Sequence, residues 1–163
     1  MEEMSAGEAQ RKHQAVMKVL SGFVICIFLA ALDQTVVIPA IPAIARDLHD
    51  SRNLSWILTA YLLASTIVAP IYGRLSDTYG RRKLLEICLI IFIIASVACG
   101  FARSIEQLVF LRALQGLGGG GLMSLAQAAI ADAVTPRERG RYQGYLAGVW
   151  AVASIAGPLV GGF

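Results

Sequence analysis

The chain has 163 residues, of which 56% are hydrophobic and only 15% are charged, and its formal net charge is +3. These proportions lie outside the usual range of soluble globular domains, so an ordinary soluble domain is excluded. They indicate a membrane protein.

Apolar stretches along the chain predict five membrane-spanning helices. Runs of about 20 residues with few or no charges can cross the hydrocarbon core of a bilayer as helices. We expect such spans at about 19–45, 54–73, 84–102, 107–133 and 142–163. The first stretch is not read as a cleaved signal peptide, because it continues past Asp33 to Ala45 with no cleavage pattern. Residues 1–18 are predicted to form a polar cytoplasmic leader.

Basic residues between alternate spans predict the orientation. Ten of them fall on the side of the N-terminus and three on the opposite side. The ten are Arg11, Lys12, Lys18, Arg74, Arg81, Arg82, Lys83, Arg137, Arg139 and Arg141, and the three are Arg46, Arg52 and Arg103. Cytoplasmic loops carry an excess of Lys and Arg, so we expect a cytoplasmic N-terminus in the plasma membrane and no nucleic-acid partner.

Asp33 is the first residue with predicted chemistry. At a rise of about 1.5 Å per residue from Val19, it lies about 21 Å into a hydrocarbon core about 30 Å thick. A carboxylate at that depth is costly unless it is paired or faces water, where it can take up and release protons. The alternative is that Pro39 and Pro42 break the helix nearby, so that the carboxylate is only hydrated or caps a helix end.

Arg112 is the second such residue, because it lies about 10 Å deep when counted from Ile105. Its side chain could simply extend to the outer surface. We favour a pair with Asp33, since two opposite charges at similar depth offset each other's burial, and protonation of Asp33 would weaken the pair. Gln115 lies one turn further on the same helical face.

The glycines of "RALQGLGGGGLM" (112–123) have two interpretations. Gly116, Gly118 and Gly121 have the G-x-G-x-x-G spacing of a dinucleotide-binding turn, which requires a preceding strand that the sequence does not provide. Alternatively, the glycines lie inside a helix and allow close helix packing, as small residues four apart do in membranes. The same spacing at Gly144/Gly148 and Gly157/Gly161 predicts that the fourth and fifth spans pack closely together.

The segment "GRLSDTYGRRKLL" (73–85) is predicted to be a tight cytoplasmic loop with a basic cluster. It resembles the signature loop of the major facilitator superfamily, G-x-L-x-D-x-x-G-R-[RK], at every specified position. "LDQTVVIPAIP" (32–42) resembles the first-span motif of drug/proton antiporters with fourteen spans, and "RALQGLGGG" (112–120) resembles their fourth-span motif.

The last span is similar to the fifth-span antiporter motif G-x8-G-x3-G-P-x2-G-G, with Ala153 at its second glycine. The matching positions include Gly144, Gly148, Gly157, Pro158, Gly161 and Gly162. The resemblance covers 19–163. It implies an all-α membrane protein whose five helices form most of an N-terminal six-helix half, truncated before the sixth span.

The resemblance also implies roles for individual residues. Asp33, Arg112 and Gln115 match positions of the cavity and of proton coupling. The cytoplasmic gating positions match Gly73, Asp77, Gly80, Arg81 and Arg82. In this arrangement the carboxylate of Asp77 meets a helix of the other half, and Arg81 pairs with an acid at the end of the fourth span, for which Asp132 is the candidate.

The predicted function is proton-coupled efflux of drugs or other amphipathic small molecules by alternating access, without enzymatic activity, cofactor or metal. The partners are protons, the substrate, the lipid bilayer and the C-terminal half of the same transporter, without which we expect no activity. A solute importer of the same fold and a membrane scaffold that does not transport remain alternatives. His13 and His49 are predicted outside the hydrocarbon and receive no role in proton transfer.

Overall fold

The computed structural model describes residues 6–48, 53–133 and 136–161, with side chains described for 22–48, 53–132, 140–141 and 143–161. The described chain forms five helices. They are α1 (Ala6–Asp47), α2 (Leu54–Tyr79), α3 (Arg81–Cys99), α4 (Ile105–Ala133) and α5 (Pro136–Gly161). No strand occurs in these ranges, so the predicted all-α fold is confirmed.

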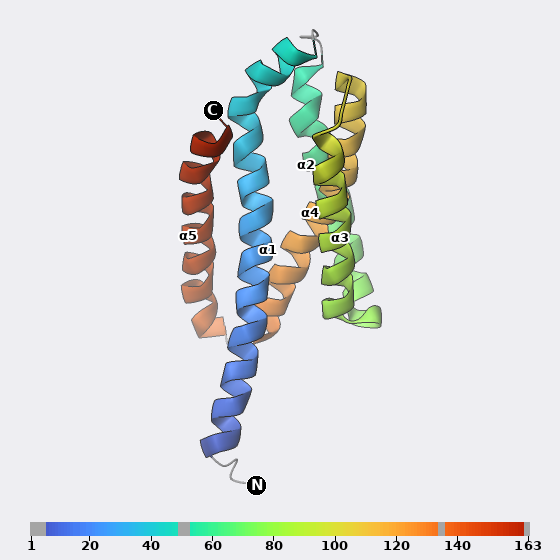
Figure 1. Cartoon of the computed structure of the whole chain (residues 1–163). Helices are drawn as coiled ribbons and strands as arrows, with labels where there is room; N and C mark the ends of the chain where they lie inside the picture. The colour runs from blue at the N-terminus through green and yellow to red at the C-terminus, as the bar shows by residue number, and fades with distance from the viewer. Residues whose placement is uncertain (1–5, 49–52, 134–135, 162–163) are drawn as a thin grey trace.

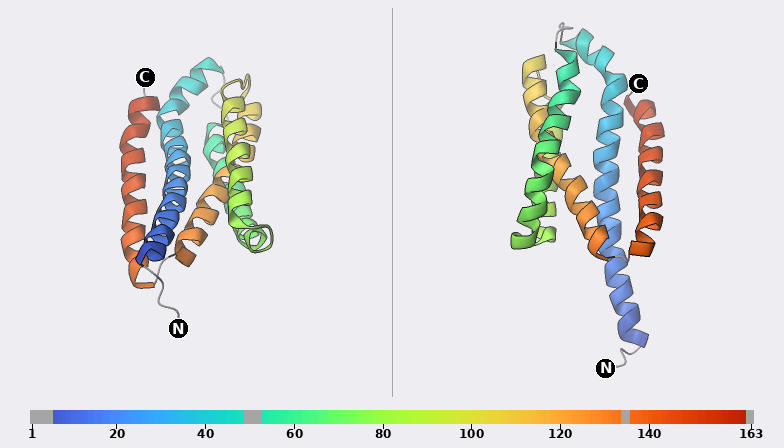
Figure 2. Two further views of the ribbon diagram at one scale, coloured as in Figure 1. Left: turned by 60° about the horizontal axis from the view of Figure 1, so that its bottom comes forward. Right: turned by 180° about the vertical axis from the view of Figure 1, so that it is seen from behind.

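The helices form two groups that α4 connects. α2, α3 and the first part of α4 lie side by side, while α5 lies along α1 (Figure 1). α4 runs obliquely from the first group toward α1, which Figure 2 shows from behind. At its far end, Ala126 and Ile130 pack against Phe23 and Ile27 of α1. α1 also packs against α2, since Val37 of α1 and Ile57 of α2 share a hydrophobic cluster with Leu108 of α4.

The glycines of α4 allow α2 and α3 to approach its backbone. A Cβ added at Gly116 or Gly120 would collide with the α2 backbone at Tyr61 or Ser65. One added at Gly118 would lie 2.7 Å from both the carbonyl oxygen of Cys88 and the amide nitrogen of Phe92 in α3. The interpretation as helix-packing glycines is therefore confirmed, and the dinucleotide-binding turn is not present.

α5 packs against α1, which corrects the prediction that it packs closely with α4. A Cβ at Gly157 or Gly161 would meet Thr35 or the carbonyl oxygen of Val36 in α1, whereas one at Gly144 or Gly148 would meet nothing within 4 Å. Ala153 is fully buried, and its carbonyl oxygen accepts a hydrogen bond of 2.8 Å from the Thr35 hydroxyl. Small residues therefore do allow close packing here, but with a different partner helix.

The segment 73–85, which was expected to form a loop, is almost entirely helical. Gly73 lies inside α2, and only Gly80 separates α2 from α3. Gly80 has φ 87°, a backbone conformation in which a side chain would be strained. The tight turn thus depends on one glycine rather than on a glycine at each end.

The two prolines of α1 do not end the helix, since α1 continues to Asp47. Figure 1 shows a change of direction in its last turns, as expected where proline removes a backbone hydrogen bond. The interpretation that Pro39 and Pro42 break the helix beside Asp33 is therefore wrong.

Four of the described helices contain a stretch long and apolar enough to cross a membrane: Gly22–Asp47, Leu54–Tyr79, Ile105–Asp132 and Gln143–Gly161. The 19 residues of α3 include Arg81, Arg82, Lys83 and Glu86, so this helix lacks an equally long stretch with so few charges. Its crossing of the bilayer remains a prediction.

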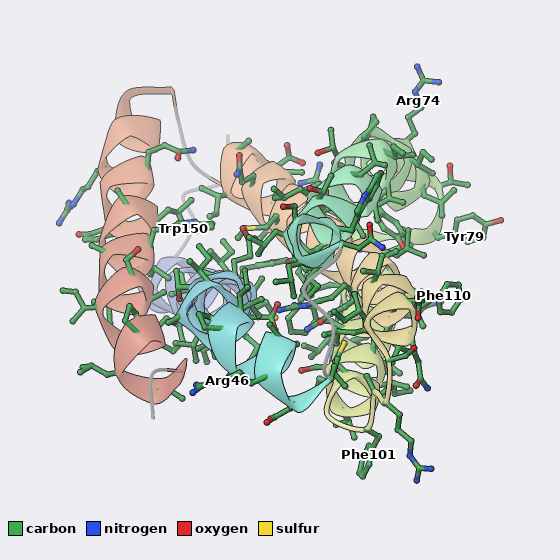
Figure 3. The ribbon with its side chains drawn as sticks, turned by 90° about the horizontal axis from the view of Figure 1, so that it is seen from above. Arg46, Arg74, Tyr79, Phe101, Phe110 and Trp150 are labelled. Atoms are coloured by element: carbon green, nitrogen blue, oxygen red, sulfur yellow. The ribbon has the colours of Figure 1, made fainter. Side chains whose placement is uncertain are left out.

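Large apolar side chains cover much of the outer surface. Phe101 is 76% exposed and Phe110 69% exposed, and both point outward together with Tyr79 (Figure 3). Isoleucines of α3 and α5 add to this surface, among them Ile94 and Ile155. Exposed apolar area on this scale is typical of a protein that faces lipid or further protein.

Candidate functional site

A buried hydrogen-bonded network joins α1 to α4 near the middle of the bundle. Arg112 donates from Nη1 to Asp33 Oδ2 at 2.6 Å and to Gln115 Oε1 at 2.9 Å. Gln115 in turn donates from Nε2 to Asp33 Oδ1 at 2.9 Å. The amide oxygen thus faces the cation and the amide nitrogen faces the carboxylate, so both ends of the Gln115 amide have a hydrogen-bond partner. The structure brings together the three residues predicted for this site.

The network is almost completely removed from solvent. The side chains of Arg112 and Asp33 are 6% and 16% exposed, and Gln115 is 1% exposed. Buried charges of opposite sign attract each other strongly, but leaving either one without its partner is costly. Loss of the charge of Asp33 would therefore leave the Arg112 guanidinium buried without a counter-charge.

Tyr61 and Cys99 complete the surroundings of the network. The Arg112 guanidinium carbon lies 5.8 Å from the centre of the Tyr61 ring, within the range of a cation–π contact. The Cys99 thiol donates to Gln115 Oε1 with a distance of 3.6 Å between sulfur and oxygen. Sequence reasoning missed both residues, because an aromatic or a cysteine inside an apolar run has no distinguishing pattern.

A cavity of about 380 Å³ extends from the network to one end of the bundle. Asp33, Arg112 and Gln115 line its inner part, and Asp47 and Leu48 line it where α1 ends. This is the end at which α3 also ends and α4 begins. The carboxylate of Asp33 is therefore adjacent to a space in which water or a proton carrier fits.

A second ion pair lies at the opposite end of α4. Arg81 Nη2 is 2.5 Å from Asp132 Oδ2, and Arg81 Nη1 donates to the carbonyl oxygen of Ala128 at 2.7 Å. A cation near the last carbonyls of a helix is also favoured by the helix dipole. Arg81, at the start of α3, thus holds the end of α4, as the resemblance implies for these two residues.

Other predicted site residues do not join either cluster. Asp77 is exposed and makes no ion pair with the described residues, and Arg82 pairs with Glu86 one turn along α3 at 3.0 Å. Gly144 and Gly148 face open space, while Pro158 lies inside α5 with its ring exposed. Gly162 and His49 lie outside the described residues, as does the side chain of His13.

Comparison with known proteins places the chain in a family. The profile of the Major Facilitator Superfamily matches residues 23–163. The chain is 42% identical over 144 residues to Multidrug transporter protein MdtP of Bacillus subtilis, covering 88% of this chain and 27% of that protein. It is 39% identical over 155 residues to Efflux pump FUS6 of Gibberella moniliformis, covering 95% and 28%.

An uncharacterized MFS-type transporter of Schizosaccharomyces pombe, C16A3.17c, is 43% identical over 144 residues, covering 88% of this chain and 24% of that protein. The chain therefore spans about a quarter of the length of these curated relatives. The family is one of transporters rather than enzymes. With a profile match across all five helices, this chain belongs to the Major Facilitator Superfamily.

Proposed function

We propose that the chain acts as the N-terminal part of a proton-coupled efflux transporter in the plasma membrane, together with a C-terminal part that completes the cavity. The observation that carries the proposal is the buried network of Asp33, Arg112 and Gln115 beside a cavity. The similarity to proteins named efflux pump and multidrug transporter supports export as the direction and drugs as the substrates.

The network supplies a mechanism for coupling. When Asp33 is ionised, its carboxylate on α1 attracts and holds the Arg112 side chain of α4. When a proton binds, the carboxyl becomes neutral, the attraction to Arg112 falls, and α4 is less firmly held to α1. Inward movement of the proton and export of the substrate then alternate as the halves rock around the site.

The second pair supplies a gate. Arg81 and Asp132 hold the start of α3 to the end of α4 on the side that carries the basic residues of the α2–α3 turn. We infer that this side is cytoplasmic, because basic residues concentrate on the cytoplasmic side of membrane proteins. The cavity leading to Asp33 then opens toward the outside, from which the proton arrives.

The test is a chimera in which this chain replaces the segment that it matches in the Bacillus subtilis transporter. Everted membrane vesicles containing the chimera should accumulate ethidium when a proton gradient is imposed, and should release protons when ethidium is added. Asp33→Asn should abolish both signals. Glu86→Gln, which changes an exposed carboxylate beside Arg82, serves as the matched control and should leave both unchanged.

The alternatives give different results in the same assay. Ethidium accumulation that persists in Asp33→Asn would remove the carboxylate from the mechanism. Proton movement in the same direction as the solute would indicate an importer. A chimera that inserts in the membrane at normal levels and moves neither species would indicate a scaffold.

A further inference from the structure

A second cavity, of about 390 Å³, lies between α1, α2 and α4. Its lining differs from that of the first cavity, because it contains no Asp and no Arg. The polar side chains that line it are Gln34, Tyr61, Ser65, Thr66, Ser124 and Gln127, and the others are alanine, glycine and methionine. A cation in this cavity would meet no opposite charge, so the lining favours an uncharged molecule with hydrogen-bonding groups.

One buried hydroxyl at this cavity has no acceptor for its proton. Tyr61 is 3% exposed, and the interaction of its hydroxyl with the Gln34 side chain is one in which the Tyr61 oxygen accepts, so its proton is not donated to any described residue. It is the only such buried side-chain atom among the described residues. Leaving the proton of a buried hydroxyl without an acceptor is unfavourable, and a group of this kind often marks a site where a ligand or water binds.

The position of the hydroxyl depends on Gly119 of α4. A Cβ at residue 119 would collide with the oxygen of Tyr61. Gly119 and Tyr61 both line the second cavity. The glycine therefore leaves room for the hydroxyl at the cavity wall, where any other residue would push it away.

The other hydroxyls that line this cavity already donate hydrogen bonds to backbone carbonyl oxygens. Ser65 and Thr66 both donate to the carbonyl oxygen of Leu62, at 2.9 and 2.8 Å, and Ser124 donates to that of Gly121 at 3.3 Å. These three can only accept a further hydrogen bond. Tyr61 is thus the hydroxyl that can still donate, and the ligand that it fits carries an acceptor oxygen or nitrogen.

Tyr61 also contacts the buried network on its other side, because its ring lies beside the Arg112 guanidinium. A ligand that holds the hydroxyl therefore fixes the ring against the cation that pairs with Asp33. We propose that Tyr61 donates a hydrogen bond to an acceptor atom of an uncharged amphipathic substrate in the second cavity. The bound substrate then acts on the Asp33–Arg112 pair by fixing the Tyr61 ring beside the guanidinium. This proposal rests on the proposed transport function.

The experiment compares two probes in the chimeric transporter: chloramphenicol, which is uncharged and has carbonyl and nitro acceptors, and ethidium, which is a cation. Tyr61→Phe removes only the hydroxyl oxygen and keeps the ring beside Arg112. We expect it to raise the KM for chloramphenicol about fivefold to tenfold, with kcat, the KM for ethidium and the pH profile unchanged. Tyr61→Leu, which also removes the ring, should in addition shift the pH profile of transport.

The controls separate folding and the proposed function from this inference. Normal thermal unfolding of Tyr61→Phe excludes a folding defect. Thr59→Val removes a hydroxyl of the same helix that is bonded to the carbonyl oxygen of Ser55 and lies outside the second cavity, so it should leave the KM for chloramphenicol unchanged. If the unsubstituted chimera moves neither probe with protons, the proposed function fails. If it exports both and Tyr61→Phe leaves the KM for chloramphenicol unchanged, or if it exports ethidium alone, the inference about Tyr61 is wrong.

Discussion

Two ion pairs of the same chemistry lie in very different surroundings. Asp33 and Arg112 are 16% and 6% exposed, whereas Asp132 and Arg81 are 66% and 27% exposed, with nearly equal separations of 2.6 and 2.5 Å. Burial, rather than distance, sets how much each pair contributes, because water screens the exposed pair and hardly reaches the buried one. The difference suits a proton-sensitive centre at one place and an easily opened contact at the other.

The buried pair is also satisfied more completely. Gln115 bonds both of its members, whereas Arg81 divides its guanidinium between Asp132 and a backbone carbonyl. Loss of one member therefore leaves an unpaired charge in the first case and a charge that water can solvate in the second. Two substitutions test this contrast directly, and a third tests the α3–α4 contact that the exposed pair also joins. They are given from the largest expected effect to the smallest.

Arg112→Met should have the largest effect, since it leaves the Asp33 carboxylate buried without its cation. We expect the free energy of unfolding to fall by about 3–5 kcal/mol, as measured by thermal or denaturant unfolding of the purified protein. The double variant Asp33→Asn/Arg112→Met removes both charges and should recover part of this loss. Equal stability of Arg112→Met and the unsubstituted protein would show that the two charges are not paired.

Gly118→Ala should have an intermediate effect, because its methyl group would lie 2.7 Å from backbone atoms of Cys88 and Phe92. Separating α4 from α3 to relieve this contact should reduce the free energy of unfolding by about 1–3 kcal/mol. Gly148→Ala is the matched control, because a Cβ there meets nothing within 4 Å. Similar unfolding midpoints for the two variants would contradict the close approach of α3 and α4.

Asp132→Asn should have the smallest effect on stability. An exposed pair contributes about 0.2–1 kcal/mol, so the unfolding midpoint should change little, and the difference should shrink further at high salt. The rate of transport by the chimera should change clearly even though the unfolding midpoint hardly does, because the pair holds α3 to α4 at the proposed gate. A loss of stability as large as that of Arg112→Met would make the pair structural and remove the contrast between the two sites.

Much of the site could be predicted from the sequence, because charges inside apolar stretches are rare and their depth can be counted. Asp33 and Arg112 were therefore expected at similar depth, and their pairing is present in the structure. The helical state of the glycine-rich segment followed from the apolar residues on either side of it. Residue roles in proton coupling and gating stay predictions.

Other features could not be predicted, because the sequence does not say which helices are neighbours. Small residues in the last span indicate close packing but not that the partner is Thr35 of α1. The segment around the basic cluster was predicted as a loop because glycines at 73 and 80 are typical of turns, but only Gly80 lies at a helix end. Tyr61 has no charge, so neither its free hydroxyl proton nor its position between the second cavity and Arg112 could be predicted from the sequence.

The one-residue turn at Gly80 has a consequence for the order of assembly. Chains emerge from the ribosome N-terminus first, so α2 and α3 are available as a hairpin before α4 follows. The backbones that α4 contacts through its glycines are then already in place when it inserts. α1 is made before the hairpin and α4, whereas its partner α5 is made after them. The face of α1 around Thr35 therefore stays uncovered by α5 until the hairpin and α4 have been made.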